Sequence, residues 1–264
     1  MPAHADELLR VATDGDPDPV ALLAIVERDA VLSAMVLRLV NSASYGLPRD
    51  VSELNHAVVL LGVAELRTLA LAASMASLFA PGDNSTSEAP GWDHAFATAC
   101  AARALAEELA PGQEEAAFAA GMLHDIGELV IGTSLSDANA VLLLTSLDRR
   151  GQARLAAEED ALGANHAELG AALAEHWSIP AHLVAAIANH HSPTMAGARA
   201  DLTTLVFAGE VLCDTFLVAG DGAGVDGLLM LESLGAVRPE AMALRVRETV
   251  MSRVTDTRLA MKGA

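Results

Sequence analysis

The sequence predicts an all-α protein, a multi-helix bundle in which a smaller N-terminal helical bundle precedes a larger helical half. Hydrophobic residues make up 52% of the chain but aromatic residues only 3%, a composition that suits helices packed through small side chains. Apolar residues recur at helical spacing along most of the chain, and clusters of Gly, Pro, Asn and Ser separate the periodic segments. The 264 residues are enough for one large domain or two fused small ones.

The first 80 residues account for the N-terminal bundle. Asp18 and Pro19 read as an N-cap and a first helical residue, and they predict a helix that runs to about residue 28. A second helix contains the apolar positions from 32 to 40 and ends at the turn-forming segment 41–48. Asp50 or Ser52 caps a third helix that Gly62 ends, and a fourth covers residues 64–79.

The segment 41–48 reads as a structural cap and turn. We expect Asn41 and Ser42 to bond to nearby backbone at the helix end, and Gly46 to take a positive φ angle. Tyr45 can pack with its hydroxyl near the surface.

A polar segment rich in Gly, Pro and Ser, residues 81–90, is the predicted link between the two halves. Helical patterns then cover residues 92–110, 114–124, 136–150, 165–177, 180–190 and 199–219. Residues 219–227 read as a glycine-rich loop, and a C-terminal helix over 239–261 carries basic and acidic residues on a face that we expect to be solvated. The predicted units are therefore 1–80, the linker 81–90, the half 91–219, and the loop and helix 220–264.

The charge balance excludes several classes of partner. Sixteen basic residues stand against 35 acidic ones, and the net charge of −19 repels phosphate backbones, so we expect no nucleic-acid partner. No stretch reads as a membrane-spanning helix, and the acidic N-terminus lacks the features of a signal peptide, so a cytoplasmic protein without a membrane partner is predicted. Cys100 and Cys213 lie in apolar helical patterns and read as buried thiols.

Chemistry is suggested first by the segment 121–127, Gly-Met-Leu-His-Asp-Ile-Gly. It places His124 beside Asp125 at the end of an apolar helix. Imidazole nitrogen and carboxylate oxygen suit iron, manganese, zinc or nickel. Neighbours on a helix diverge by about 100°, so both side chains reach one ion only if it lies between them or the helix ends there.

Other histidines and acids stand at comparable helix ends. His94 opens a helix thirty residues earlier, His190 and His191 close a later one, and Glu210 lies in an apolar helix where an unpaired carboxylate would be costly. Two interpretations stay open for these residues: an ion-binding pocket, or separate hydrogen-bonded residues of the core and surface. His176 and His182 read as structural or exposed.

The order of these residues resembles the HD superfamily of metal-dependent phosphohydrolases, and more specifically the HDOD group, the HD-related output domain of bacterial signalling proteins. The resemblance covers about residues 15–215. It is carried by LRLVNSASYGLP (37–48), AVVLLGVAELRTLAL (57–71), GMLHDIGEL (121–129), HAELGAALAEHWSIP (166–180) and AIANHHSP (186–193).

The resemblance implies an HD-like fold for the C-terminal half and a divalent metal site. The implied ligands are His94, His124, Asp125, His166, His190, His191 and Glu210. Glu210 stands where the HD pattern has Asp. In the related HD-GYP phosphodiesterases clustered metal ions activate water, but here Glu128 replaces the lysine of their motif and the Gly-Tyr-Pro is missing. These two departures disfavour cleavage of cyclic dinucleotides.

The resemblance favours a cytoplasmic bacterial regulatory protein that acts by binding a signalling protein, with or without a retained metal. The alternative is an HD-type metal-dependent phosphohydrolase acting on a nucleotide or cyclic dinucleotide. A pocket that senses a small ligand without chemistry is a third reading, and a homo-oligomer is compatible with all three. The sequence leaves enzymatic activity open, and names neither the metal nor the partner.

Overall fold

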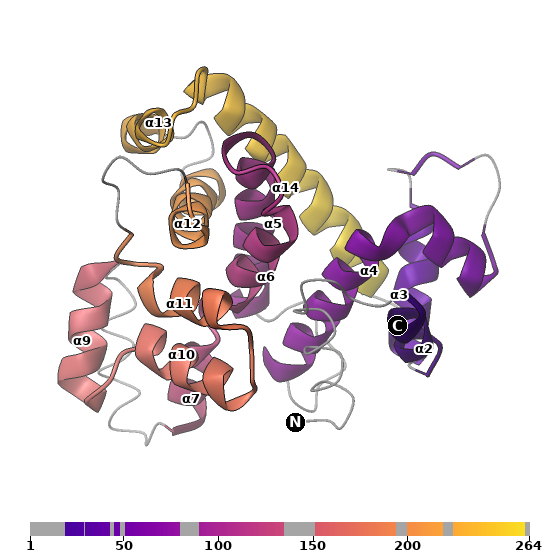
Figure 1. Cartoon of the computed structure of the whole chain (residues 1–264), viewed down its shortest axis with the longest axis horizontal. Helices are drawn as coiled ribbons and strands as arrows, with labels where there is room; N and C mark the ends of the chain where they lie inside the picture. Colours follow the sequence, from indigo (N-terminus) through magenta and orange to yellow (C-terminus); the bar gives the residue numbers. More distant parts are fainter. Residues whose placement is uncertain are drawn as a thin grey trace.

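A computed structural model describes residues 19–28, 30–42, 45–47, 51–79, 90–134, 151–193, 200–218 and 224–261. Within these ranges every regular element is an α-helix, which confirms the predicted all-α class (Figure 1). The helices are α2 (Pro19–Arg28), α3 (Ala30–Val40), α4 (Leu54–Phe79), α5 (Pro90–Leu109), α6 (Glu114–Leu123), α7 (Gly127–Ser134), α9 (Gln152–Leu162), α10 (His166–His176), α11 (Ala181–Asn189), α12 (Leu202–Val218), α13 (Gly224–Ser233) and α14 (Pro239–Met261).

The N-terminal helices α2, α3 and α4 pack against one another, and the turn after α3 is fixed by Asn41. The Asn41 side chain donates to the carbonyls of Leu37 and Val51 and accepts from the Val51 amide at 2.7 Å, as the turn motif predicts. Gly46 has the expected positive φ, 55°. The Ser42 hydroxyl differs from the prediction, because it is buried and makes no hydrogen bond within the described part of the chain.

Helix α4 contains the predicted break at Gly62, whose φ of 78° and ψ of 168° are not helical. Among the described helices, the stretch Leu54–Ala73 alone has the length and hydropathy of a membrane span, with a mean hydropathy of 1.6. Gly62 divides this stretch into two segments, both shorter than the ~20 residues that cross a bilayer. The second segment also carries Glu65, which pairs with Arg253 of α14, so α4 reads as a kinked core helix.

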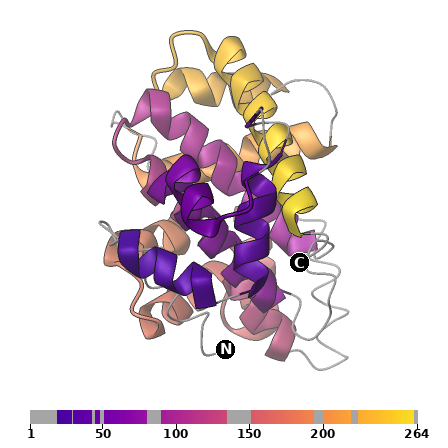
Figure 2. The ribbon, with the colours of Figure 1, turned by 90° about the vertical axis from the view of Figure 1, so that its right-hand side faces the viewer.

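Helix α5 lies at the centre of the molecule and packs against α4, α6, α12 and α14. The Trp92 indole donates to the Ala72 carbonyl of α4 at 3.0 Å, so the two predicted halves meet along this helix. Figure 1 shows α14 running from α13 past α5 towards α3, and the turned view in Figure 2 shows this yellow helix beside the indigo N-terminal helices.

The predicted solvated face of α14 is present, since Glu240, Arg245 and Glu248 are exposed, and two further arginines of this helix pair with acids of other helices. Arg253 pairs with Glu65 of α4, and Arg258 pairs with Asp93 of α5, where its Nε donates at 2.7 Å. The predicted buried thiols are confirmed, since Cys100 and Cys213 are both free and buried.

Two helices were not anticipated, and one predicted loop is partly helical. Helices α7 and α9 occupy segments whose residues show no clear apolar period. Helix α13 begins at Gly224 inside the predicted glycine-rich loop, because Leu231 and its apolar neighbours bury against the core. The predicted linker 81–90, apart from Pro90, and the predicted helix 136–150 lie outside the described residues.

Candidate metal centre

The His124-Asp125 pair lies where α6 ends, at the turn that leads into α7. Leu123 is the last residue of α6, and the Ile126 amide bonds back to the Leu123 carbonyl at 3.0 Å. Because the helix ends here, the two neighbouring side chains meet, with 3.2 Å between His124 Nε2 and Asp125 Oδ2. The condition for a shared site, a helix that ends at this pair, is therefore fulfilled.

Helix α10 approaches this turn at very short range. A Cβ atom added to Gly127 would lie 1.9 Å from the His166 carbonyl oxygen and 2.6 Å from the Gly170 nitrogen, so only glycine fits. This contact holds His166, the first residue of α10, opposite Asp125. His166 Nε2 lies 3.4 Å from Asp125 Oδ1.

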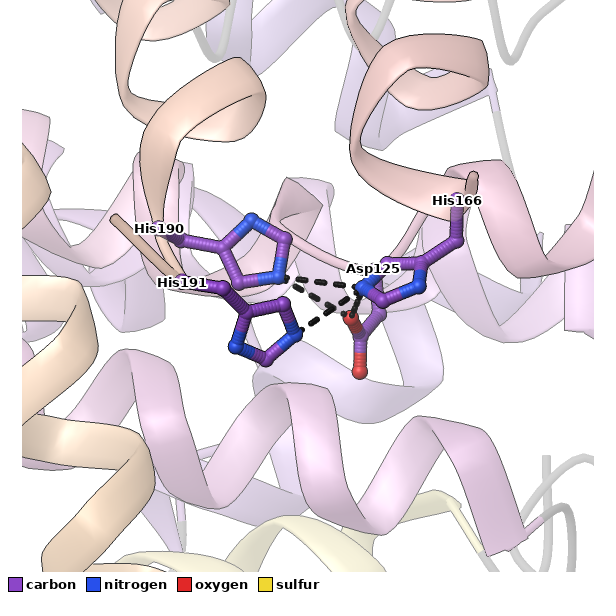
Figure 3. Close-up of side chains that lie close together, drawn as sticks. All are labelled: Asp125, His166, His190 and His191. Atoms are coloured by element: carbon purple, nitrogen blue, oxygen red, sulfur yellow. Dashed lines mark hydrogen bonds and ion pairs between the residues drawn. The ribbon is translucent and has the colours of Figure 1, made fainter. Parts of the chain in front are cut away.

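The end of α11 supplies two more imidazoles to the same point. His190 and His191 follow Asn189, and their Nε2 atoms lie 3.3 and 3.1 Å from His166 Nε2. Figure 3 shows the three rings and Asp125 pointing towards one another from different parts of the chain. All four residues are buried and form one group of converging ligand atoms.

A second group adjoins the first on the other side of Asp125. It consists of His94 from α5, His124, and Glu210 from α12, whose ligand atoms lie within 4.8 Å of one another. Asp125 Oδ2 is 3.5 Å from His94 Nε2 as well as 3.2 Å from His124 Nε2. The two oxygens of Asp125 thus face one group each.

All seven residues singled out in the sequence come together in these two groups, and His176 and His182 are exposed as expected. The sequence did not anticipate Glu158 and Arg154 of α9. Glu158 bonds to His166 Nδ1 at 2.6 Å, and Arg154 Nε bonds to Glu158 at 2.9 Å. The one signal for them in the sequence is the spacing of four residues between Arg154 and Glu158, eight residues before His166. Ion pairs on the surface of a helix have the same spacing, so this signal does not identify a functional pair.

The Nδ1 atoms of His124 and His190 point away from the centre. His124 Nδ1 lies 2.7 Å from the Gly121 carbonyl, and His190 Nδ1 lies 2.7 Å from the Ile187 carbonyl. A ring that donates its Nδ1–H to an acceptor and is otherwise neutral carries its lone pair on Nε2. The Nε2 atoms of His166 and His190 then face each other as two acceptors 3.3 Å apart.

The charges of the centre are concentrated on His124 and Asp125. Burial alone would lower the pKa of His124, but the Asp125 carboxylate outweighs burial and raises that pKa to about 9. Burial likewise opposes ionisation of Asp125, yet His124 holds the pKa of this carboxyl well below its usual range. Burial raises the pKa of Glu210 to about 7, although His124 works in the opposite direction.

The pKa values of three other imidazoles, those of His191, His190 and His94, are lowered, which favours their neutral form. Burial, reinforced by His190, lowers the pKa of His191 to about 2. Burial also lowers the pKa of His190 and His94, although Asp125 opposes the shift in both. Neutral imidazoles are the form that binds a metal ion.

A family model for the HDOD domain matches residues 1–193, which is most of the chain. The chain belongs to the HDOD family. The match covers every candidate ligand except Glu210, and it agrees with the fold and with the sequence motifs around these residues.

Relatives of this HDOD chain include proteins of several bacteria. An "uncharacterized protein" of Treponema pallidum (strain Nichols) is 26% identical over 195 residues, which cover 73% of this chain and 37% of that protein. The chain therefore spans little more than a third of the length of that relative.

Two solved structures share the fold. The "putative phosphohydrolase" of Shewanella amazonensis SB2B is 28% identical, with a TM-score of 0.73 over 99% of this chain and 92% of that one. The "putative signal transduction protein" of Marinobacter aquaeolei VT8 is 23% identical, with a TM-score of 0.73 over 97% of this chain and 59% of that one. The second likeness is one of fold, and this HDOD chain spans 59% of that protein.

Proposed function

We propose that this HDOD chain binds two divalent transition-metal ions and hydrolyses a phosphate ester of the nucleotide class. The observation that carries the proposal is that the Nε2 atoms of the buried His166 and His190 lie 3.3 Å apart, while the Nδ1 atom of each ring lies within hydrogen-bond distance of an acceptor oxygen. Two lone pairs at that distance repel each other, and a cation between them turns the repulsion into coordination.

The second group also fits a cation. Glu210 Oε2 is buried and makes no hydrogen bond within the described part of the chain, although it lies near His191 Nδ1 at 3.6 Å. A buried carboxylate without a donor is costly, and a metal ion supplies the missing partner. Mixed imidazole and carboxylate ligands suit iron, manganese, zinc or nickel.

The residues of the chain define what such a centre can do. A divalent ion, when bound, polarises phosphoryl oxygens and lowers the pKa of water at neutral pH. Asp125 offers one oxygen to each group and so holds both groups in register. The side chains of His94 and Glu210 are 27% and 15% exposed, whereas those of His166 and His190 are fully buried, so a substrate reaches the second group first.

A second candidate function is a non-catalytic regulator that binds a signalling protein and uses the metal as a structural element. Glu128, three residues after Asp125, places an acid beside the centre, and Arg154 is paired with Glu128 and Glu158. An arginine that is already paired with two carboxylates attracts a phosphate group less strongly than an arginine without such partners. The name of the Marinobacter structure points in the same direction. A cytoplasmic location, a protein partner and a homo-oligomer belong to this proposal.

Metal content and turnover separate the two candidates. Protein purified without chelators should contain about two transition ions per chain and release phosphate from some member of a panel of nucleotides and cyclic dinucleotides. A His124→Ala, Asp125→Ala double variant should lose both properties, whereas His176→Ala, which alters an exposed histidine, should keep them. A metal-free protein without turnover would refute the hydrolase. Metal without turnover, together with a reproducible partner in a pull-down from the native cytoplasm, would favour the regulator.

A further inference from the structure

Glu158 is a buried carboxylate outside the two ligand groups. Of the residues of α9, all of which the structure describes, Glu158 alone is buried. A fully buried acid needs donors, and Glu158 has three: its Oε2 accepts from the His166 amide at 2.9 Å and from His166 Nδ1 at 2.6 Å, and its Oε1 accepts from Arg154 Nε at 2.9 Å. Two of the three donors belong to His166.

This bonding pattern fixes both the tautomer and the orientation of the His166 ring. A carboxylate on Nδ1 requires a proton there, so the lone pair stays on Nε2, which faces Asp125, His190 and His191. His124 and His190 reach the same result through backbone carbonyls of their own helices. His166 differs because the group that holds it is charged and comes from another helix.

The other contacts of α9 lead to the same centre. Arg154 pairs with Glu128 of α7 as well as with Glu158. Gln152, the first residue of α9, donates to the His191 carbonyl at 2.8 Å and also bonds to the Ser192 hydroxyl. The helix is therefore held at His166, at His191 and beside Asp125, with little apolar burial of its own.

We propose that Glu158 is a positioning residue of the metal centre, and that Arg154 holds it in place. Glu158 keeps the His166 Nε2 lone pair aimed at the buried four-ligand group and makes this nitrogen a stronger donor to a cation. The inference rests on the proposed metal centre, because it assigns a role to a residue that supports one of its ligands. Loss of an outer carboxylate of this kind typically weakens metal binding by about 10- to 100-fold.

The test uses the chain of 264 residues and three variants: Glu158→Ala, Glu158→Gln and the matched control Glu159→Ala, which removes an exposed acid at the next position of the same helix. Affinity for Mn²⁺ is measured by competition with a chelator. We expect Glu158→Ala to lower the affinity of the buried four-ligand group for Mn²⁺ about 10- to 100-fold. Glu158→Gln keeps an oxygen acceptor for Nδ1–H and should recover part of that affinity, and Glu159→Ala should match the wild type. Equal affinity in all four proteins would overturn the proposal.

A second readout needs no metal. In metal-free protein with ¹⁵N-labelled histidine, nuclear magnetic resonance should find His166 protonated on Nδ1 in the wild type and in Glu158→Gln, and a mixture of tautomers in Glu158→Ala. An unchanged His166 tautomer in Glu158→Ala would overturn the proposal, even if that variant binds metal weakly for other reasons. If the wild-type protein bound no Mn²⁺, the proposed metal centre would be refuted. The tautomer measurement would still decide whether Glu158 positions His166. The Gln variant preserves the side-chain volume, so a folding defect in the Ala variant leaves the test intact.

Discussion

Asp125 lies between the two groups of candidate ligands and faces each of them with one carboxylate oxygen. Its Oδ1 lies 3.4 Å from His166 Nε2 and 3.5 Å from His190 Nε2, while its Oδ2 faces His94 and His124. An Asp125→Asn substitution keeps the shape but removes the charge and one of the two acceptor oxygens. We expect the metal content to fall from about two ions per chain to one or fewer, as measured by elemental analysis. Asp160→Asn, an exposed position on α9, is the control, and two ions in the Asp125→Asn protein would contradict the bridging role.

Proton occupancy at single residues also gives the centre a pH dependence. The pKa values of His124, about 9, and Glu210, about 7, are raised, so in metal-free protein at neutral pH His124 carries a proton and Glu210 is about half protonated. An ion that binds the second group must displace these protons, and its affinity therefore rises with pH. In the buried group the pKa of His191 is lowered to about 2, so this ligand is already neutral and has no proton to lose.

Calorimetric titration with Mn²⁺ measures this difference. Between pH 6 and pH 8.5 the affinity of the second group for Mn²⁺ should rise by about tenfold per pH unit for each proton displaced. The heat of binding should vary with the ionisation enthalpy of the buffer. The affinity of the buried four-ligand group should change much less with pH. If the affinity of the second group were the same at pH 6 and pH 8.5, His124 and Glu210 would not be its ligands.

Helix packing decides whether the ligands meet, and the contact of α7 with α10 is the tightest point. A Gly127→Ala substitution would force α7 away from the His166 carbonyl, at a cost of about 3 kcal/mol in the free energy of unfolding. Gly132→Ala, in the same helix with open space around the new methyl group, should be neutral or stabilising by up to about 1 kcal/mol. Urea unfolding of both variants tests this, and the Gly127→Ala variant should also bind less metal. Equal stability of the two variants would argue against the close contact.

Some helices of the molecule could be predicted from the sequence, and others could not. The helices Pro19–Arg28 and Pro239–Met261 agree with their predicted bounds, because a proline suits the first position of a helix and is a signal that can be read locally. Helix α9 escaped prediction because its one buried side chain is an acid, and apolar periodicity carries no signal for a helix held by polar contacts. The order of the motifs pointed to the candidate ligands, whereas Glu158 and Arg154 are brought to the same place only by contacts between separate helices.

In the whole molecule, α14 connects the parts that the sequence divides. The Arg38 side chain of α3 donates to the Ala260 carbonyl at 3.0 Å, and Arg253 pairs with Glu65 of α4. Near the same end of α14, Arg258 pairs with Asp93, the neighbour of the candidate ligand His94. A chain with a net charge of −19 thus uses arginines of its last described helix to neutralise acids of both halves.

This continuity predicts that the two halves unfold together. The two tryptophans are suitable probes, because Trp92 lies at the junction with α4 and Trp177 is the C-cap of α10, the helix that begins at His166. In Trp177→Phe and Trp92→Phe proteins, the remaining tryptophan should report the same urea midpoint as the far-ultraviolet circular dichroism of that protein. If residues 1–80 were an independent unit, the bond between Trp92 and the Ala72 carbonyl would break first. The fluorescence of Trp92 would then change at a lower urea concentration than the fluorescence of Trp177. Coincident transitions would mean that the stability of the N-terminal helices is coupled to that of the helices that carry the candidate ligands. In that case metal binding should raise the urea midpoint reported by Trp92 as well as the one reported by Trp177.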